Sequence, residues 1–285
     1  MIIAVSGKKG SGKDTVAKIF QYFTLPKSAR TISMEEWVHE FTYHEEIDNL
    51  STFLENRSYA AKLKDITSII LNVPRWQLEL EEFKKKILPK CWNRWVLSSD
   101  ISRSLHTTEA EAKGIIKFLK LHPDEYTLSY EAMTIRQFLQ TVGTDVMRDM
   151  IHPNAWINSM FTDYNVIGHT NVTALDDPAG KLLTTPNYPS WIVTDVRFEN
   201  ELTAIKKGIP GKMADKKFDF RCSIRVERPE YLAETRDDRH TSETALDGYQ
   251  NWDHVITNDC DLDQLAFKVH NLIKSDPGLQ KYFHI

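Results

Sequence analysis

The sequence lacks several features that would place it in a specialised class of protein. Only three of its 285 residues are cysteines (Cys91, Cys222 and Cys260), odd in number and far apart. Such cysteines form neither a disulfide framework nor a zinc-binding pattern, which indicates a reducing compartment, and we expect a cytoplasmic protein. No apolar run approaches the roughly 20 residues that a membrane-spanning helix needs. The N-terminus is a short apolar stretch followed directly by glycines, unlike a secretory signal.

The chain also lacks an excess of basic residues. Its 36 Lys and Arg stand against 40 Asp and Glu, for a net charge of −4, and 41% of its residues are hydrophobic. Proteins that bind nucleic acid without specificity are usually basic, so we expect no stable nucleic-acid partner. The sequence shows no internal repeat and no low-complexity tail. Its length fits a single domain over residues 1–285 that carries insertions.

A glycine-rich segment, AVSGKKGSGKDTVAKIF, occupies residues 4–20 near the start of the chain. Gly7, four further residues, and then Gly12 and Lys13 match the pattern of a phosphate-binding loop. The loop follows an apolar, β-branched run typical of a buried strand and precedes a helical pattern of apolar residues. Backbone N–H groups around Gly7, Gly10 and Gly12, together with the helix N-terminus, then favour an anion. The alternative is a glycine-rich turn with a chance lysine.

The residue after Lys13 departs from the common form of this loop. That position normally carries Ser or Thr, whose hydroxyl binds magnesium, whereas here it is Asp14, with Thr15 one place later. A carboxylate is itself a hard oxygen group that can hold a magnesium-bound water or orient Lys13. The loop is therefore interpreted as intact but unusual.

Four later segments predict further strands of one sheet. They cover residues 56–71, 190–201, 222–229 and 253–273, and the first and last of them lead into a helical pattern. Strands that alternate with helices favour an α/β fold with a parallel sheet covered on both faces. Ligands of such sheets gather at the carboxyl ends of the strands, so we expect three groups to meet there: Ser6–Lys13, Asp195 and Asn258.

Helical signals lie between these strands. Residues 134–137 (TIRQ) have the form of a capping box and predict a helix start. We expect Gly143 to end that helix, Thr144 to cap the next, and Asn154 to start a third. Arg136 lies in a first turn, where a cation opposes the helix dipole unless it faces an anion. The alternative for Arg136 is a solvated surface arginine.

Two stretches are interpreted as insertions. Residues 29–55 are rich in acidic and aromatic residues, and residues 163–189 are polar and rich in turn-forming residues. The second stretch predicts a long loop or a small hairpin excursion.

Several segments together resemble one protein family. They are GKKGSGKDT, YAAKLKD, TIRQFLQTVGTDVMRDMIHPNAW and IVTDVRFENE, followed by RHTSETAL. In combination they look like the deoxynucleoside monophosphate kinases of tailed bacteriophages, from near residue 1 to about residue 273. The phosphate loop alone is common to many proteins, whereas the combination is specific.

The resemblance implies a fold and an activity. The fold is that of the P-loop nucleoside monophosphate kinases, a parallel sheet flanked by helices with a helical acceptor-binding insertion and a lid. The activity is transfer of a phosphoryl group from ATP, with Mg²⁺, to a deoxynucleoside monophosphate (dNMP), giving ADP and dNDP as precursors for viral DNA synthesis. An Asp at position 14 is tolerated in this branch.

The resemblance also implies roles for matching residues. The loop is implied to bind the ATP phosphates and the magnesium shell. Its residues are Gly7, Gly10, Ser11, Gly12, Lys13, Asp14 and Thr15. Arg136 is implied to bind the acceptor monophosphate, with Trp156 packing on the base or sugar and Thr144 beside them. The weaker acceptor candidates are Lys62 and Arg148.

The remaining implied residues lie near the loop or in a lid. Asp195, Arg197 and Glu201 are implied to line the site, with Asp195 near the metal or the acceptor. The segment 228–243 occupies the position of the lid, and three of its residues are implied to close on the phosphoryl group: Arg228, Arg236 and Arg239. Lys13, Asp14, Arg136 and Asp195 are thus the candidate catalytic residues.

Alternatives to this activity stay open. Gln137 follows Arg136 where a second cation would have helped, and the two insertions can reshape the base site. Another small-molecule kinase of the same fold, of the phosphomevalonate or dephospho-coenzyme A type, is the next interpretation. A nucleic-acid ATPase is disfavoured by the acidic balance, and a regulatory GTPase by the lack of an Asn-Lys-x-Asp segment. Dimers are common in the family, so the resemblance also implies that two copies of this chain can form a homodimer.

Overall fold

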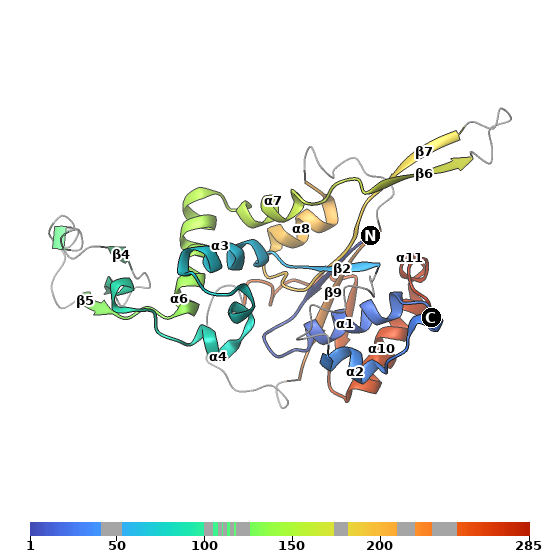
Figure 1. Ribbon diagram of the computed structural model, residues 1–285, viewed down its shortest axis with the longest axis horizontal. Coiled ribbons are helices and arrows are strands. Elements are labelled where there is room, and N and C mark those ends of the chain that lie inside the picture. Colours follow the sequence, from blue (N-terminus) through green and yellow to red (C-terminus); the bar gives the residue numbers. More distant parts are fainter. Residues whose placement is uncertain are drawn as a thin grey trace. The chain divides into compact units, whose positions relative to one another are not determined.

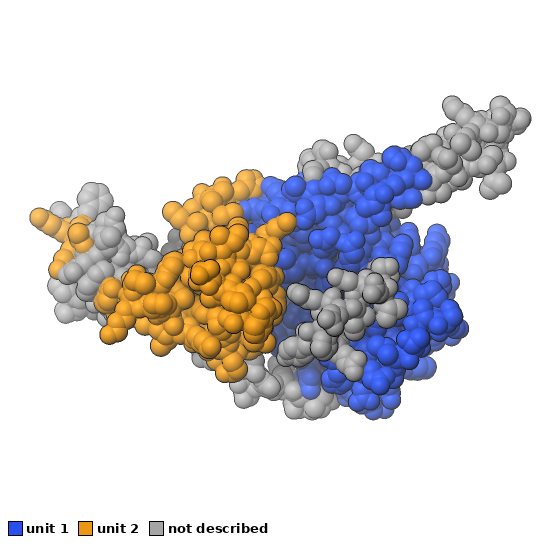
Figure 2. Space-filling model, viewed as in Figure 1, with its two compact units in different colours: residues 1–61, 154–285 blue, residues 62–153 orange. Residues whose placement is uncertain are grey.

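The computed structural model describes residues 1–40, 53–99, 105–107, 110, 113, 114, 117, 126–173, 182–209, 220–229 and 244–285. The chain forms two compact units (Figure 2). The sheet unit comprises Met1–Ala61 with Asn154–Ile285, and the inserted unit comprises Lys62–Pro153. Among the described residues, no helix has the length and apolar character required to span a membrane.

Five parallel strands form the centre of the sheet unit, in the spatial order β10-β9-β1-β8-β2 (Figure 1). Their bounds are β1 (Ile2–Ser6), β2 (Leu54–Arg57), β8 (Ser190–Val193), β9 (Arg221–Glu227) and β10 (His254–Thr257). Every residue of β1 and β8 is buried, as strands covered on both faces require. The sheet confirms the predicted α/β fold.

Helices cover both faces of this sheet. On one face, Ile3 and Val5 share a hydrophobic core with residues of α1 (Lys13–Thr24) and α10 (Leu262–Ser275). Successive strand residues point to opposite faces, so the fully buried Ile2 and Ala4 point to the other side. There α8 (Glu199–Lys207) lies against β1 and β9. Short helices complete the unit: η1 (Lys27–Ala29), α2 (Met34–Glu40), α7 (Ala155–Phe161) and α11 (Pro277–Gln280).

The two stretches interpreted as insertions contain regular structure where they are described. Within residues 163–189, β6 (Gly168–Thr173) pairs antiparallel with β7 (Leu182–Asn187) as a hairpin. Within residues 29–55 lie α2 and the first half of β2, while residues 41–52 fall outside the described part of the chain. Asn154 stands at the N-terminal boundary of α7, which confirms the helix start expected there.

The inserted unit is built from short helices around a small core. Its helices are α3 (Ala61–Leu71, from its second residue), η3 (Arg75–Glu79), α4 (Glu81–Lys84), η4 (Lys90–Trp92), α6 (Ile135–Gln140) and η6 (Thr141–Ile151). Its strands are β3 (Arg94–Ser99), β4 (Leu105–Thr107) and β5 (Tyr126–Glu131), in the antiparallel order β4-β3-β5. The core consists of Leu78, Leu88, Met133, Ile135 and Phe138.

The expected capping box is present at the start of α6. The backbone N–H of Gln137 donates to the hydroxyl of Thr134 over 3.2 Å, and the backbone N–H of Thr134 donates to Oε1 of Gln137 over 2.8 Å. This reciprocal pair satisfies two N–H groups that a helix start leaves without partners. Arg136 therefore lies in the first turn, as predicted.

The expectation that Gly143 ends this helix is wrong. The chain continues from α6 into η6, a π-type helix that runs through Gly143 and Thr144, so Thr144 does not start a new helix. The reason lies in packing, because a Cβ on Gly143 would come within 2.7 Å of Cδ2 of Leu63 on α3. The glycine makes room for a neighbouring side chain, and a sequence motif cannot reveal that neighbour.

Candidate active site

The turn between β1 and α1 has the backbone geometry of an anion-binding loop. Gly10 and Gly12 adopt φ of 78° and 88°, in the left-handed region that favours glycine. A Cβ on Gly7 would lie 2.3 Å from Oγ of Ser11 and 2.7 Å from the carbonyl oxygen of Val226. Side chains are thus excluded from the concave side of the loop, which leaves the main chain to line it.

One polar atom in this loop calls for a ligand. Ser11 is only 3% exposed, and within the described part of the chain its Oγ has no hydrogen-bond partner. An unsatisfied buried hydroxyl costs about 1–3 kcal/mol. The loop also begins α1, whose N-terminus favours negative charge. A phosphate oxygen is therefore a suitable acceptor for the hydrogen bond of the Ser11 hydroxyl, and the metal would accompany that phosphate. The residues present therefore fit a phosphate group and Mg²⁺.

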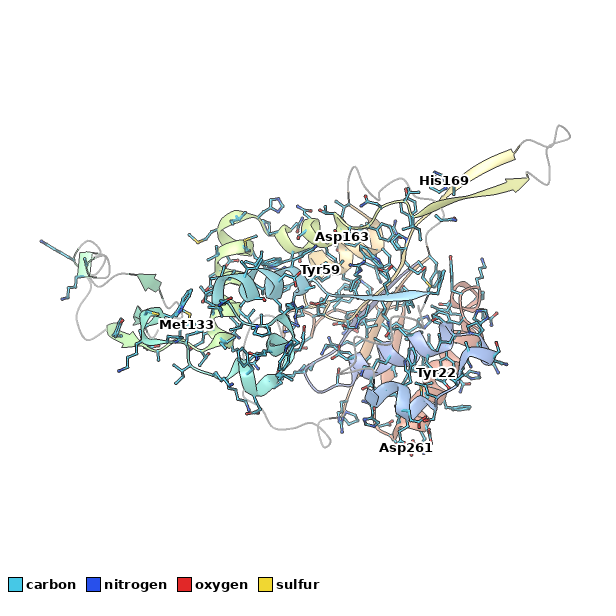
Figure 3. All side chains as sticks on the ribbon, in the orientation of Figure 1. Tyr22, Tyr59, Met133, Asp163, His169 and Asp261 are labelled. Carbon is cyan, nitrogen blue, oxygen red and sulfur yellow. The ribbon has the colours of Figure 1, made fainter. Side chains whose placement is uncertain are left out.

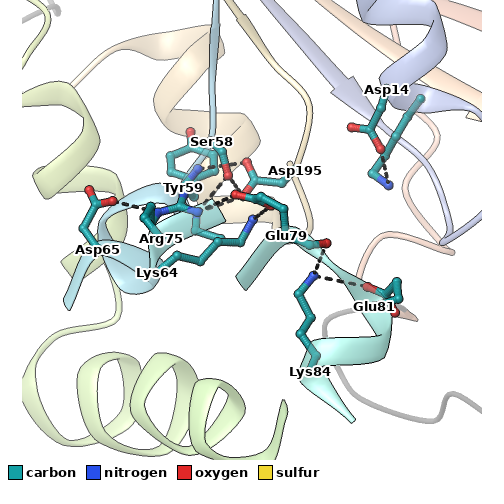
Figure 4. Close-up of polar contacts among 12 residues, drawn as sticks. Asp14, Ser58, Tyr59, Lys64, Asp65, Arg75, Glu79, Glu81, Lys84 and Asp195 are labelled. Carbon is teal, nitrogen blue, oxygen red and sulfur yellow. Dashed lines mark hydrogen bonds and ion pairs between the residues drawn. The ribbon is translucent and has the colours of Figure 1, made fainter. Parts of the chain in front are cut away.

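Lys13 and Asp14 lie side by side at the start of α1 (Figure 4). Nζ of Lys13 is 3.5 Å from Oδ2 of Asp14. The lysine side chain is mostly buried, whereas that of Asp14 is 67% exposed. This contact has the geometry that the orienting role suggested by the sequence for Asp14 would need. Thr15 is half-buried in the same first turn.

A buried cation that sequence reasoning missed lies beside the loop. Arg225 of β9 is buried, and its Nη1 donates to Oγ of Ser6 over 3.2 Å, which in turn donates to the carbonyl of Val196 over 2.8 Å. Its Nη2 lies 3.3 Å from Oδ1 of Asp247, while Nζ of Lys8 lies 3.2 Å from Oδ2. The available signal was a charged residue inside the otherwise apolar strand CSIRVE.

Asp195 follows β8, as predicted, but its carboxylate is engaged by the chain that leads into α3 (Figure 4). Oδ2 accepts hydrogen bonds from the hydroxyl of Ser58 (2.6 Å) and the N–H of Ala60 (2.9 Å). Oδ1 accepts from the N–H of Tyr59 over 2.9 Å. Both oxygens thus hold a turn in place, which is a positioning role that the sequence did not indicate.

Glu201 is also engaged by backbone groups. It is buried, and its Oε2 accepts from the N–H groups of Arg197 (2.8 Å) and Phe198 (3.1 Å) at the start of α8. The hydroxyl of Tyr59 donates to the carbonyl of Glu201 over 3.1 Å, and Figure 3 labels that tyrosine. Glu201 therefore fixes the loop that carries Arg197.

In the inserted unit, Arg136 pairs with a carboxylate of its own chain. Nη2 of Arg136 donates to Oε2 of Glu81 over 2.5 Å. Figure 4 shows the second partner of Glu81, Lys84, whose Nζ donates to Oε1 over 3.1 Å. Burial lowers the pKa of Lys84, and the nearby Lys64 lowers it further. The anion that the sequence predicts opposite Arg136 is thus the carboxylate of Glu81.

A second carboxylate in the inserted unit balances two more cations. Arg75 donates to Oε1 of Glu79 over 2.5 Å and to Oδ1 of Asp65 over 2.8 Å, and Lys64 also pairs with Glu79. Burial raises the pKa of Glu79, but the charges and hydrogen bonds of Lys64 and Arg75 outweigh it, so the pKa lies below its ordinary value. Sequence reasoning missed this network, because its members are spread over two elements, α3 and η3.

The other expected site residues are distributed over both units. Lys62, Thr144 and Arg148 are half-buried in the inserted unit. Trp156 belongs to α7 of the sheet unit and is only 6% exposed, so little of its ring is available to a ligand. Arg228 is exposed just after β9, whereas Arg236 and Arg239 lie outside the described residues.

One group of metal-ligating residue types occurs in the described part of the chain, away from the loop. Cys222, His254 and Asp276 offer atoms within 4.8 Å of one another. Burial raises the pKa of the Cys222 thiol, and the nearby Asp253 and Asp276 raise it further. Nε2 of His254 lies 2.8 Å from Oδ2 of Asp276, so these two groups satisfy each other. The arrangement suits a core thiol beside a histidine–carboxylate pair.

A known protein family matches most of the chain. The family model described as deoxynucleotide monophosphate kinase matches residues 1–269, a span that includes the β1–α1 loop, Arg136 and Asp195. No curated protein matches the chain.

Proposed function

The chain belongs to the deoxynucleotide monophosphate kinase family and is a phosphotransferase that acts on deoxynucleoside monophosphates. We propose that its donor is ATP with Mg²⁺ and that the β1–α1 loop holds the ATP phosphates. The observation that carries this proposal is the buried, unsatisfied hydroxyl of Ser11 inside a cradle that a Cβ on Gly7 would fill. A buried polar atom without a partner in a glycine-lined turn favours a ligand rich in oxygen atoms.

The residues of the loop suit the demands of phosphoryl transfer. This reaction asks the protein for positioning and for cancellation of charge on the transferred oxygens. The backbone from Gly7 to Gly12 orients the phosphates, and Lys13, oriented by Asp14, reaches the outer ones. Asp14 and Thr15 would hold Mg²⁺ directly or through water, and bound Mg²⁺ supplies charge neutralisation. Asp195 supports the site through water and through the turn that it already holds.

The acceptor phosphate is assigned to Arg136. Its guanidinium is paired with Glu81, so the dNMP phosphate takes the place of that carboxylate. From the resemblance of the sequence we also assign to the acceptor Thr144, Arg148 and Lys62 of the inserted unit and, in the sheet unit, the largely buried Trp156. Arg197 beside the loop, and the segment 228–243 with Arg228, Arg236 and Arg239, complete the charge around the phosphoryl group.

The biological setting follows from the resemblance of the sequence. We place the enzyme in the cytoplasm of a bacterium infected by a tailed phage, where its dNDP product leads to precursors for viral DNA. A homodimer is its proposed assembly. These assignments rest on the motifs GKDT and DVRFENE together with the segment that follows Arg136.

A turnover assay tests the donor and the acceptor together. ATP with Mg²⁺ is offered with each of the four dNMPs, and separately with phosphomevalonate, dephospho-coenzyme A and single-stranded DNA. We expect ADP formation that needs both Mg²⁺ and a dNMP and that is lost in Lys13→Ala. Turnover with another nucleoside triphosphate and none with ATP would refute the donor assignment. ATP hydrolysis stimulated by DNA alone would refute the acceptor assignment.

A further inference from the structure

Asn258, at the end of β10, links the last strand of the sheet to the phosphate loop. The residue is only 8% exposed, and its Nδ2 donates to the carbonyl oxygen of Ser11 over 2.8 Å. Its backbone N–H donates to the carbonyl of Glu227 over 2.7 Å, which extends the β9–β10 ladder by one step. The side-chain amide is therefore held from the sheet side and acts on the loop from a fixed position.

The contact falls on the peptide unit between Ser11 and Gly12. A Cβ on Gly12 would lie 2.3 Å from Nδ2 of Asn258, so the amide packs directly against this left-handed glycine. In a trans peptide the C=O and the N–H point in opposite directions. Because the carbonyl of Ser11 is bound to Asn258, the N–H of Gly12 in the same peptide is aimed away from Asn258.

We propose that Asn258 is a positioning residue for the phosphoryl donor. It fixes the Ser11–Gly12 peptide, and hence the direction of the Gly12 N–H, before the nucleotide binds. This inference rests on the proposed function, because it takes the loop to be the site of the ATP phosphates. An N–H group that is already oriented binds an anion without the entropic cost of ordering the loop.

The turn that carries Asn258 is held together by other contacts. Asp261, labelled in Figure 3, caps α10 by accepting from the N–H of Gln264 over 2.8 Å. Lys268 donates to the carbonyl of Thr257 over 2.7 Å. Neither contact involves the side chain of Asn258. Removal of that side chain therefore leaves the turn in place and mainly removes the hydrogen bond to the Ser11 carbonyl.

The test measures ATP affinity by calorimetry without acceptor, together with KM for ATP and for dNMP. In Asn258→Ala we expect ATP affinity to fall about tenfold, since a buried hydrogen bond is lost, while KM for dNMP at saturating ATP stays unchanged. The matched control is Asn165→Ala, which also removes an amide that donates to a backbone carbonyl (Thr162, 2.9 Å) but on an exposed loop. That control keeps wild-type affinity.

A second control separates positioning from general destabilisation. Ile256→Val removes one methylene from the buried core residue of β10 and leaves the hydrogen bond from Asn258 to Ser11 in place. If Ile256→Val weakens ATP binding as much as Asn258→Ala does, the positioning role is overturned. If Asn258→Ala fails to fold, the isosteric Asn258→Asp serves in its place, because a carboxylate cannot donate to the Ser11 carbonyl. Wild-type ATP affinity in that variant overturns the inference.

Lys13→Ala distinguishes failure of this inference from failure of the proposed function. If Lys13→Ala loses ATP affinity while Asn258→Ala keeps it, the loop is the donor site and Asn258 does not position it. If Lys13→Ala also binds ATP and turns over like the wild type, the loop is not the donor site and both proposals fall.

Discussion

The β1–α1 loop and the inserted unit place positive charge in two different ways. In the loop, main-chain N–H groups and lysines provide it: Nζ of Lys13 lies 3.5 Å from the well-exposed carboxylate of Asp14, and Nζ of Lys8 lies 3.2 Å from that of Asp247. In the inserted unit, Arg136 and Arg75 each lie 2.5 Å from a glutamate of the same chain. The loop thus has groups available for an anion, whereas these two arginines of the inserted unit already have carboxylate partners.

The difference has an energetic consequence. A phosphate that enters the loop satisfies the Ser11 hydroxyl, which otherwise costs about 1–3 kcal/mol. A phosphate that binds Arg136 replaces Glu81, so one charge-assisted hydrogen bond is exchanged for another and the net gain is small. We therefore expect tight binding of the donor and weaker binding of the acceptor.

The largest effect is expected from Lys13→Ala. Loss of a cation that stabilises the migrating phosphoryl group lowers kcat by roughly 10²–10³-fold or more. The fold is retained, because α1 packs through other residues, among them Val16, Ile19 and Phe20. The measurement is kcat together with the melting temperature. A well-folded variant with nearly wild-type kcat would show that the loop is not the donor site.

Arg136 and Glu81 should respond in opposite directions. Arg136→Ala loses a charged hydrogen bond to the acceptor phosphate, so KM for dNMP rises about 10–100-fold. Glu81→Gln frees Arg136 from its carboxylate, so KM for dNMP falls. The matched control is Glu82→Gln, since Glu82 pairs with Lys85 on the exposed surface (2.8 Å) and leaves KM unchanged. A rise of KM for dNMP in Glu81→Gln would contradict the proposal that the dNMP phosphate replaces the Glu81 carboxylate on Arg136.

Asp14 tests the unusual position of the loop. Asp14→Ala removes a candidate magnesium ligand and the group proposed to orient Lys13. Magnesium-dependent activity should therefore fall by about tenfold, which corresponds to the loss of roughly one charge-assisted hydrogen bond. Asp14→Ser restores the ligand type that is usual at this position and retains part of the activity. The measurement is a titration of activity with Mg²⁺. An unchanged titration curve in the alanine variant would show that Asp14 is only tolerated.

The smallest effect concerns stability and pH. Burial raises the pKa of Asp276, but hydrogen bonds from His254 and from the N–H groups of Gly278 and Leu279 outweigh it, so the folded-state pKa lies below the ordinary value. A depressed pKa stabilises the fold above the unfolded value of about 3.9, and this contribution is lost as the pH falls below it. Asp276→Asn should therefore flatten the decline of the unfolding free energy from about pH 5 downward. An equally steep decline in the variant would contradict this assignment.

The sequence predicts best what local chemistry decides. The glycines that line the phosphate loop and the capping box of Thr134 and Gln137 are local, and the structure contains both. Gly143 was misjudged because the deciding neighbour, Leu63, lies on another helix.

The two carboxylates beside the loop show a similar limit. The sequence places Asp195 at the end of a strand, and β8 ends just before it. The turn 58–60 that Asp195 holds is distant in the chain, and Glu201 uses its carboxylate to start its own helix. A carboxylate near a sheet edge is visible in the sequence, whereas its hydrogen-bond partners depend on tertiary structure.

The most direct test of the account is one pair of variants measured in the same two assays. ATP affinity without acceptor and KM for dNMP are determined for Lys13→Ala and for Arg136→Ala. The account predicts that Lys13→Ala loses ATP affinity with little change in KM for dNMP, and that Arg136→Ala keeps ATP affinity while KM for dNMP rises. Loss of ATP binding in Arg136→Ala with an unchanged KM for dNMP would contradict the assignment of donor and acceptor.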